Sequence, residues 1–145
     1  MGRFWMPQIT RDTVHKFIGE HRYAVLATVS PEHAPEAALV GFALAADFTI
    51  VFDAISTTRK CQNLLHNPRI AFVIGWKDDR TVQYEGAADM PEGRELEEIK
   101  QIYCAVWPEA PARDIWPGHI YVRVRPRWIR FSSYALPYEI EEFQF

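Results

Sequence analysis

The chain has 145 residues, of which 48% are hydrophobic and 14% aromatic, and its formal net charge is −3. This composition supports a packed core in one domain over residues 1–145 and excludes a disordered chain. The slightly acidic balance excludes the broad positive field of nucleic-acid-binding proteins, and no apolar run approaches the ~20 residues of a membrane span. We therefore expect no nucleic-acid partner and no membrane association.

The first half of the chain predicts one helix followed by an antiparallel meander. Thr10 can cap a short helix whose apolar face is formed by Val14, Phe17 and Ile18. Apolar and β-branched segments then predict strands over residues 23–29, 36–44 and 48–52. The segments between them have the composition of turns, so consecutive strands should pair as hairpins.

The second half predicts two further helices and four further strands. The spacing of Cys61, Leu64 and Leu65 predicts a helix from Thr57, and Asn67-Pro68 should end it because the residue before proline avoids the α region. Another amphipathic helix follows Pro91. Strands are predicted over residues 70–76, 81–90, 120–124 and 128–131, and the acidic tail 139–142 is predicted to be a surface arm. Together these elements predict a mainly β domain with peripheral helices, in which six or seven antiparallel strands close into a small barrel.

The two cysteines, Cys61 and Cys104, are far apart and belong to no metal or redox motif, so we expect two reduced thiols. Residues 1–6 have neither the apolar core of a signal peptide nor the Ser or Thr of a myristoylation signal. These observations favour a soluble, cytoplasmic protein.

The turn before the second predicted helix has the character of an anion site. Arg59 and Lys60 fall in the first turn of that helix with no acidic residue beside them, although helix N-termini favour negative charge. A bound phosphate would bring the backbone N–H groups, the hydroxyls of Thr57 and Thr58 and the two cations together. The alternative is a simple Ser/Thr cap with solvated cations, and the local pattern leaves both open.

The chain also carries a series of segments whose order and spacing are informative together. They are Ala27-Thr28-Val29-Ser30, Pro35, Thr57-Thr58-Arg59-Lys60-Cys61-Gln62-Asn63-Leu64, Asn67-Pro68-Arg69-Ile70-Ala71-Phe72-Val73, Val82-Gln83-Tyr84-Glu85-Gly86-Ala87-Ala88 and Val124-Arg125-Pro126-Arg127-Trp128-Ile129-Arg130-Phe131. This series, over roughly residues 10–133, resembles the pyridoxamine 5′-phosphate oxidase-like superfamily and its small general-stress-protein-like members. The resemblance implies an FMN-binding split β-barrel and a homodimer with the cofactor at the interface.

The resemblance also implies roles for individual residues. Its Ser/Thr-Arg-Lys turn, which grips the FMN phosphate, falls on Thr58, Arg59 and Lys60. Its second strand, which runs along the flavin through backbone groups, falls on Ala38, Leu39 and Val40. The end of its third strand, which also touches the flavin, falls on Phe52 and Asp53.

Some positions depart from the oxidase pattern. The second strand, residues 37–42, lacks the Arg and Lys that the oxidase directs at the phosphate. The oxidase's flavin-contacting Gln falls on Thr81, and Gln83 lies on the same face of the strand and can replace it. The late Glu-Phe-Trp pattern falls on Arg130-Phe131-Ser132, and the Arg-rich tail that holds pyridoxal phosphate is missing. We therefore do not expect true pyridoxamine phosphate oxidase activity.

Two residues have alternative interpretations. Asp53, at a strand end, either contacts the flavin or caps the turn. Trp116, in a proline-flanked loop, either reaches a flavin edge or packs as a core or interface aromatic. The histidines show no metal-binding spacing, and no metal site is expected.

Three functions remain open at this stage. The first is an FMN-dependent oxidoreductase, the second a non-catalytic flavin-binding or stress module, and the third the same barrel binding deazaflavin F420 or haem. Absorbance spectra and competitive titration distinguish them.

Overall fold

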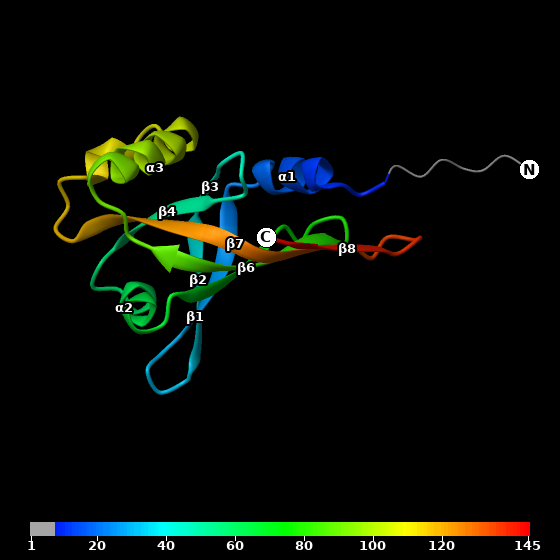
Figure 1. The fold of residues 1–145 in the computed structure, drawn as a ribbon, viewed down its shortest axis with the longest axis horizontal. Coiled ribbons are helices and arrows are strands. Elements are labelled where there is room, and N and C mark those ends of the chain that lie inside the picture. The colour runs from blue at the N-terminus through cyan, green and yellow to red at the C-terminus, as the bar shows by residue number, and fades with distance from the viewer. Residues whose placement is uncertain (1–7) are drawn as a thin grey trace, which may run out of the picture.

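A computed structural model describes residues 8–145, and residues 1–7, on which the expectation of an absent leader rests, lie outside the described part. Over the described residues the chain forms eight strands and three α-helices, with one short 3-10 helix (Figure 1). In chain order they are α1 (Arg11–Gly19), β1 (Tyr23–Val29), β2 (Pro35–Gly41), β3 (Ala43–Leu44), β4 (Ile50–Ile55), α2 (Arg59–His66), β5 (Arg69–Ile74), β6 (Arg80–Asp89), α3 (Gly93–Val106), η1 (Ala110–Arg113), β7 (His119–Ser133) and β8 (Glu139–Gln144).

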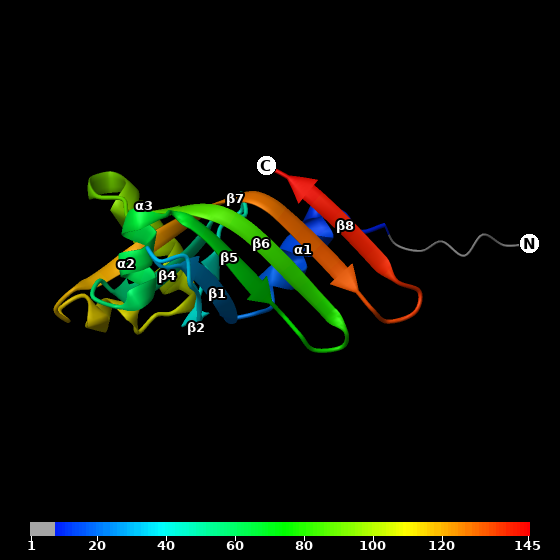
Figure 2. The same ribbon diagram turned by 90° about the horizontal axis from the view of Figure 1, so that it is seen from below.

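All the described strands belong to one sheet, in the order β2-β1-β5-β6-β7-β4-β3, and β8 pairs with β7. Every pairing is antiparallel, which confirms the predicted mainly β, antiparallel fold. Figure 2 shows β5, β6, β7 and β8 side by side on the curved sheet. The two ends of the strand order, β2 and β3, are not paired with each other, so the curled sheet stays open along a seam between β2 and the β3–β4 hairpin.

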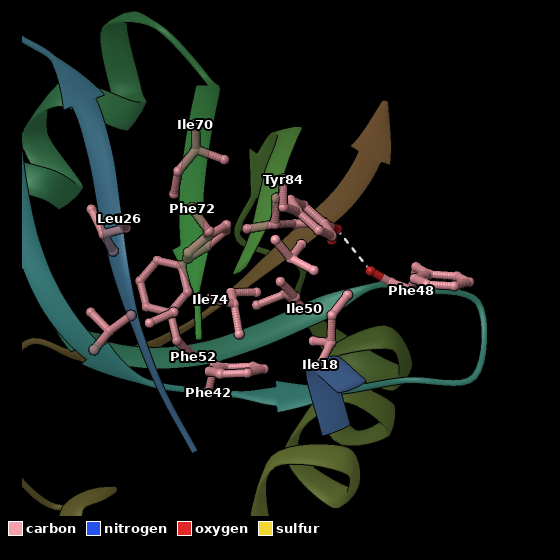
Figure 3. Packing of buried hydrophobic residues seen from close by; sticks show 14 of the residues in the cluster. Ile18, Leu26, Phe42, Phe48, Ile50, Phe52, Ile70, Phe72, Ile74 and Tyr84 are labelled. Carbon is pink, nitrogen blue, oxygen red and sulfur yellow. Dashed lines mark hydrogen bonds between the residues drawn. The ribbon is translucent and has the colours of Figure 1, made fainter. Parts of the chain in front are cut away.

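Alternation along the strands builds the core inside this curve. On β1, for example, Ala24, Leu26 and Thr28 are buried while the residues between them face outward. Figure 3 shows the centre of the cluster, where the ring of Phe72 lies 6.2 Å from that of Phe52 and 5.6 Å from that of Tyr84. Both pairs have the edge-to-face geometry that aromatic rings prefer.

The prediction of one strand over residues 36–44 was wrong, because the chain leaves the β1 ladder at Phe42. The Phe42 N–H donates to the carbonyl of Arg22 (3.0 Å), and the indole Nε1 of Trp107 donates to the Phe42 carbonyl (3.0 Å). With both backbone groups used, β2 ends at Gly41 and the chain crosses to pair with β4 as β3. A Cβ at Gly41 would lie 2.7 Å from the Trp107 ring, so this close approach needs glycine.

The two strands predicted over residues 120–131 form one continuous strand, β7. The register against β6 passes from Glu85 opposite Trp128 to Gly86 opposite Pro126, which leaves Arg127 as the extra residue of a bulge. A bulge tolerates a proline, which has no N–H to give to a ladder, so Pro126 bends the strand without ending it.

The acidic tail also differs from its prediction as a surface arm. Residues Glu139–Gln144 form β8, which pairs with residues 128–133 of β7. Arg130 and Glu142 form an ion pair across the two strands (3.2 Å), and Phe143 packs against the core. The acidic side chains point toward solvent, while the backbone pairs with β7. The high charge of the segment therefore did not indicate a strand in the sequence.

The helices cover the ends of the sheet. Thr10 caps α1 as predicted, accepting from the N–H of Thr13, and α2 ends at Asn67, as its proline signal predicts. α2 packs on β1 and β2, whereas α3 packs on β3, β4 and β7, so the two lie apart (Figure 1). No helix among the described residues is long and apolar enough to cross a membrane.

Replacing Tyr84 by Phe tests how much one buried hydroxyl contributes to this core. The Tyr84 hydroxyl lies 2.8 Å from the carbonyl of Phe48 (Figure 3) and 3.1 Å from that of Val124, and burial raises its pKa so that it keeps its proton. Because the variant leaves buried carbonyls without this donor, we expect it to lose ~1–3 kcal/mol of unfolding free energy. Urea denaturation measures the loss. Tyr134→Phe, at a half-exposed position, should match wild type, and equal stability of both variants would contradict the assigned role.

Candidate functional site

A small hollow lies where α2 begins, beside the edge strand β2. Its volume is about 180 Å³. It is lined by Leu26, Thr28, Glu36, Ala37, Ala38, Thr58, Arg59 and Lys60. The fold therefore brings Ala38 together with Thr58, Arg59 and Lys60, although the sequence separates them by 20 residues or more.

The N-terminus of α2 offers positive potential to this hollow. No side chain caps the helix, and its first turn contains no acidic residue. The Thr58 hydroxyl donates to the carbonyl of Ile55 (2.7 Å), so its proton is already used and its oxygen remains an acceptor. The first N–H groups of a helix have no partner within it, and they carry the positive end of the helix dipole.

The two cations of the hollow differ in their surroundings. Arg59 Nη1 lies 2.8 Å from a carboxylate oxygen of Glu36, and the Arg59 side chain is 76% exposed. Within residues 8–145, no ion pair includes Lys60, which is half-buried at the wall of the hollow. Lys60 is therefore available to a ligand, whereas Arg59 already has a partner.

Glu36 is held in place by residues that sequence reasoning missed. The buried amide of Asn63 donates to Glu36 (2.7 Å) and to the Thr28 hydroxyl (2.9 Å). The sequence spacing does place each residue beside a predicted site residue. Glu36 shares a strand face with Ala38, and Asn63 follows Arg59 by four residues on one helix face. Neither signal shows that the two faces meet, because α2 and β2 are distant in sequence.

The other predicted site residues occupy varied positions. Thr57 is exposed in the turn before α2, and Leu39 is exposed on the face of β2 opposite Ala38. Val40 and Phe52 lie in the core, so only their backbone groups can meet a ligand. Trp116 is exposed in the loop between η1 and β7. Their roles at the flavin stay predictions.

Asp53 belongs to a separate polar network beneath α3. It follows Phe52 on β4 and so points to the opposite side, where it accepts hydrogen bonds from Tyr103 (2.7 Å), Arg113 (2.7 Å) and His119 (2.9 Å). Burial raises the pKa of Asp53, but the hydrogen bonds from His119, Tyr103 and Arg113 outweigh it and hold the pKa below its usual value. The carboxylate thus ties α3, η1 and β7 to β4, and contact with a flavin stays a prediction for it.

The outer face of the sheet is apolar across three strands. Leu39, Val25 and Val73 are opposite one another on β2, β1 and β5, and all three are exposed. Gln83 continues this row on β6, opposite Val73. Gln83 is exposed, no described element covers the row, and the contact predicted between Gln83 and a flavin stays a prediction.

A larger hollow of about 740 Å³ lies further along the same face. Its lining includes the small side chains of Ala27 and Ala71, the ring of Trp128 and three charged residues, Arg69, Arg127 and Glu85. The groove thus combines apolar surface with two cations and one carboxylate, a mixture that ligand pockets commonly have.

A family model for pyridoxamine 5′-phosphate oxidase matches residues 10–133. The chain belongs to that family. No curated protein matches the sequence. The match covers β1 to β7, α2 and every residue that lines the small hollow, and it ends before β8.

Solved structures confirm the split-barrel fold. A haem-binding protein from Mycobacterium smegmatis superposes with a TM-score of 0.81 at 20% identity, over 96% of this chain and 60% of that chain. General Stress Protein 26 from Bacillus anthracis has a TM-score of 0.70 at 20% identity, over 92% and 97%. A pyridoxamine 5′-phosphate oxidase-related, FMN-binding protein from Nostoc punctiforme has a TM-score of 0.64 at 14% identity, over 86% and 87%. The chain thus spans about 60% of the Mycobacterium protein and most of the other two.

The hollow fits the phosphate end of FMN but not the whole molecule. Arg59, Lys60 and the uncapped start of α2 are donors of the kind that bind phosphate. Among the described residues that line the hollow, Glu36 alone carries negative charge and opposes an anion. Pockets for whole ligands measure roughly 300–1,000 Å³, so a flavin ring must extend beyond this hollow.

Replacing Asp53 by Asn tests the network beneath α3. Because the ionised carboxylate has a lowered pKa, its stabilisation is present above its ordinary pKa and is lost as pH falls through the native pKa. We expect Asp53→Asn to cost ~2 kcal/mol at pH 5.5 or above. Urea denaturation should show this difference shrinking as the pH falls below about 4.

Asp78→Asn is the matched control, because Asp78 is exposed at the β5–β6 turn with a positive φ that Asn also tolerates. It should behave as wild type at each pH. A cost for Asp53→Asn that stays constant down to pH 3 would show that ionisation of Asp53 does not matter to the network.

Proposed function

We propose that this protein binds FMN, with the phosphate in the hollow at the start of α2, and serves as a flavin-dependent oxidoreductase distinct from the true oxidase. The observation that carries the proposal is the convergence of Arg59, Lys60 and an uncapped helix N-terminus on a hollow beside a free strand edge. Membership of the family and the FMN-binding relative from Nostoc punctiforme support it.

The chain's own residues bind and orient the cofactor in this proposal. Arg59 and Lys60 hold the phosphate, and β2, which has a neighbour on one side only among the described strands, presents the backbone groups of residues 38–40 to the rest of the flavin. When bound, FMN supplies the ring that accepts and returns a hydride. No side chain is assigned as an acid or base.

We further propose a homodimer in which a second copy completes the ligand site. The small volume of the hollow supports this, because one chain provides only part of a flavin-sized pocket. The exposed row of Leu39, Val25 and Val73 gives the partner an apolar surface beside β2. A shared interface would then enclose the ring.

Removing both cations tests the phosphate site. Arg59→Ala/Lys60→Ala should weaken FMN binding about 30-fold, at ~1 kcal/mol for each partly exposed charged contact, and should leave riboflavin binding nearly unchanged. Quenching of flavin fluorescence on titration measures both affinities. Lys77→Ala/Arg94→Ala removes two exposed cations elsewhere and should bind as wild type. Equal FMN affinity in all three proteins would place the phosphate outside the hollow.

Charging the apolar row tests the dimer. Val25→Glu/Val73→Glu puts two carboxylates opposite each other on adjacent strands of the outer face. Sedimentation equilibrium should give twice the 16.9 kDa chain mass for wild type and the single-chain mass for the variant. Leu136→Glu, exposed in the β7–β8 turn, should remain dimeric. A wild-type protein that sediments as one chain at micromolar concentration argues against the proposal.

A non-catalytic flavin module differs from an oxidoreductase in one measurable respect. An oxidoreductase should bleach its bound flavin absorbance on addition of NADH or NADPH without oxygen and recover it with an acceptor. A storage or stress module would hold FMN stoichiometrically and show neither change.

Haem is the second candidate ligand, favoured by one specific observation. The 740 Å³ groove is lined by small apolar side chains, by Trp128 and by two cations, Arg69 and Arg127, that suit paired carboxylates, although Glu85 also lines it. The haem-binding relative from Mycobacterium smegmatis supports it. Titration with FMN, F420 and haem, followed by absorbance, ranks the three; a perturbed haem band that Arg69→Ala/Arg127→Ala abolishes would favour haem.

A further inference from the structure

We infer that Glu36 is an internal anion that competes with the ligand's phosphate for Arg59, and so sets how strongly the hollow prefers FMN to a flavin without phosphate. The inference rests on the proposed function, because it assigns a selectivity role within the same hollow.

The Glu36 carboxylate is held in place, whereas the Arg59 guanidinium can move. The Glu36 side chain is 17% exposed and is held by Asn63, which is itself 3% exposed. Arg59, at 76% exposed, is restrained mainly by its contact with Glu36. An entering phosphate must therefore draw Arg59 away from Glu36 or share it, while the carboxylate stays where it is.

The net positive charge of the residues that line the hollow is smaller than the negative charge of a phosphate ester. Arg59 and Lys60 carry two positive charges and Glu36 one negative charge, which leaves one positive charge in excess. A phosphate monoester carries about −1.5 to −2 near pH 7. Like charges a few ångströms apart repel even at a partly solvated surface, so Glu36 lowers phosphate affinity both by this repulsion and by engaging Arg59.

The same carboxylate does not oppose an uncharged chain end. Riboflavin ends in a hydroxyl, which can donate to the Glu36 carboxylate where FMN has a charged ester. Glu36 should therefore affect FMN and riboflavin differently, and this difference separates selectivity from a general effect on folding.

Glu36→Gln tests the inference with little structural change. Glutamine keeps the shape and the oxygen that accepts from Asn63 but removes the charge. We expect FMN to bind about tenfold more tightly, equivalent to ~1.4 kcal/mol, and riboflavin to bind as before or more weakly. Inorganic phosphate should also bind the variant more tightly, which a competition titration shows when FMN is kept well below its dissociation constant. Glu32→Gln, which removes an exposed charge from the β1–β2 turn, is the matched control and should equal wild type.

Fluorescence titrations of the three full-length proteins give distinct outcomes. Unchanged or weaker FMN binding by Glu36→Gln, in a protein whose FMN binding still depends on Arg59 and Lys60, overturns the inference and leaves the proposed function standing. Equal tightening of FMN and riboflavin also overturns it, because the effect would then not concern the phosphate. Failure of wild type and Glu36→Gln to bind either flavin overturns both. Glu36→Ala should reproduce the direction seen with Gln, with unfolding midpoints confirming that both variants are folded.

Discussion

The bend at Phe42 is the constraint on which the arrangement of the site depends. The Phe42 N–H makes the last bond to the β1 side, at Arg22, its carbonyl accepts from Trp107, and the chain then pairs with β4 as β3, so that β2 and β3 are the unpaired ends of the sheet. An open edge has unpaired backbone groups, which proteins normally cover. Here α2 follows β4 and packs back on β1 and β2, so the start of a helix comes to lie beside that edge. The hollow is a consequence of this crossing.

The structure contains two separate groups of polar residues, one around Asp53 and one around Glu36. Phe52 fills the core, while Asp53 faces α3 and takes three donors, so its charge is satisfied within the protein. Glu36 is paired with Arg59 and accepts from Asn63, whereas no ion pair within residues 8–145 includes Lys60. Charges that are paired on several sides stabilise the fold, whereas a cation without a partner beside an uncapped helix is available to a ligand. This contrast supports our proposal that a ligand binds at α2, whereas the Asp53 network supports the fold beneath α3.

Much of the fold could be predicted from the sequence because its signals are local. The apolar, β-branched strand over residues 23–29, the Thr10 cap and the Asn67-Pro68 stop each depend on a few neighbouring residues, and the structure confirms these three elements, although alternate residues of the strand are exposed. The continuity of β7 through Pro126 and the pairing of β8 could not, because each depends on a partner strand distant in sequence. The site divides in the same way. The turn at residues 57–60 could be named as a candidate anion site from its own residues, but the contact of Glu36 with Arg59 depends on β2 and α2 meeting, and the donors to Asp53 come from three separate elements.

The central claim is that a flavin phosphate binds where α2 begins. A crystal structure of the protein grown with FMN tests it most directly. The account predicts phosphate density within hydrogen-bonding distance of Arg59 and Lys60, with the ring extending along the free edge of β2. Phosphate density elsewhere, for example between Arg69 and Arg127 on the outer face, would contradict it.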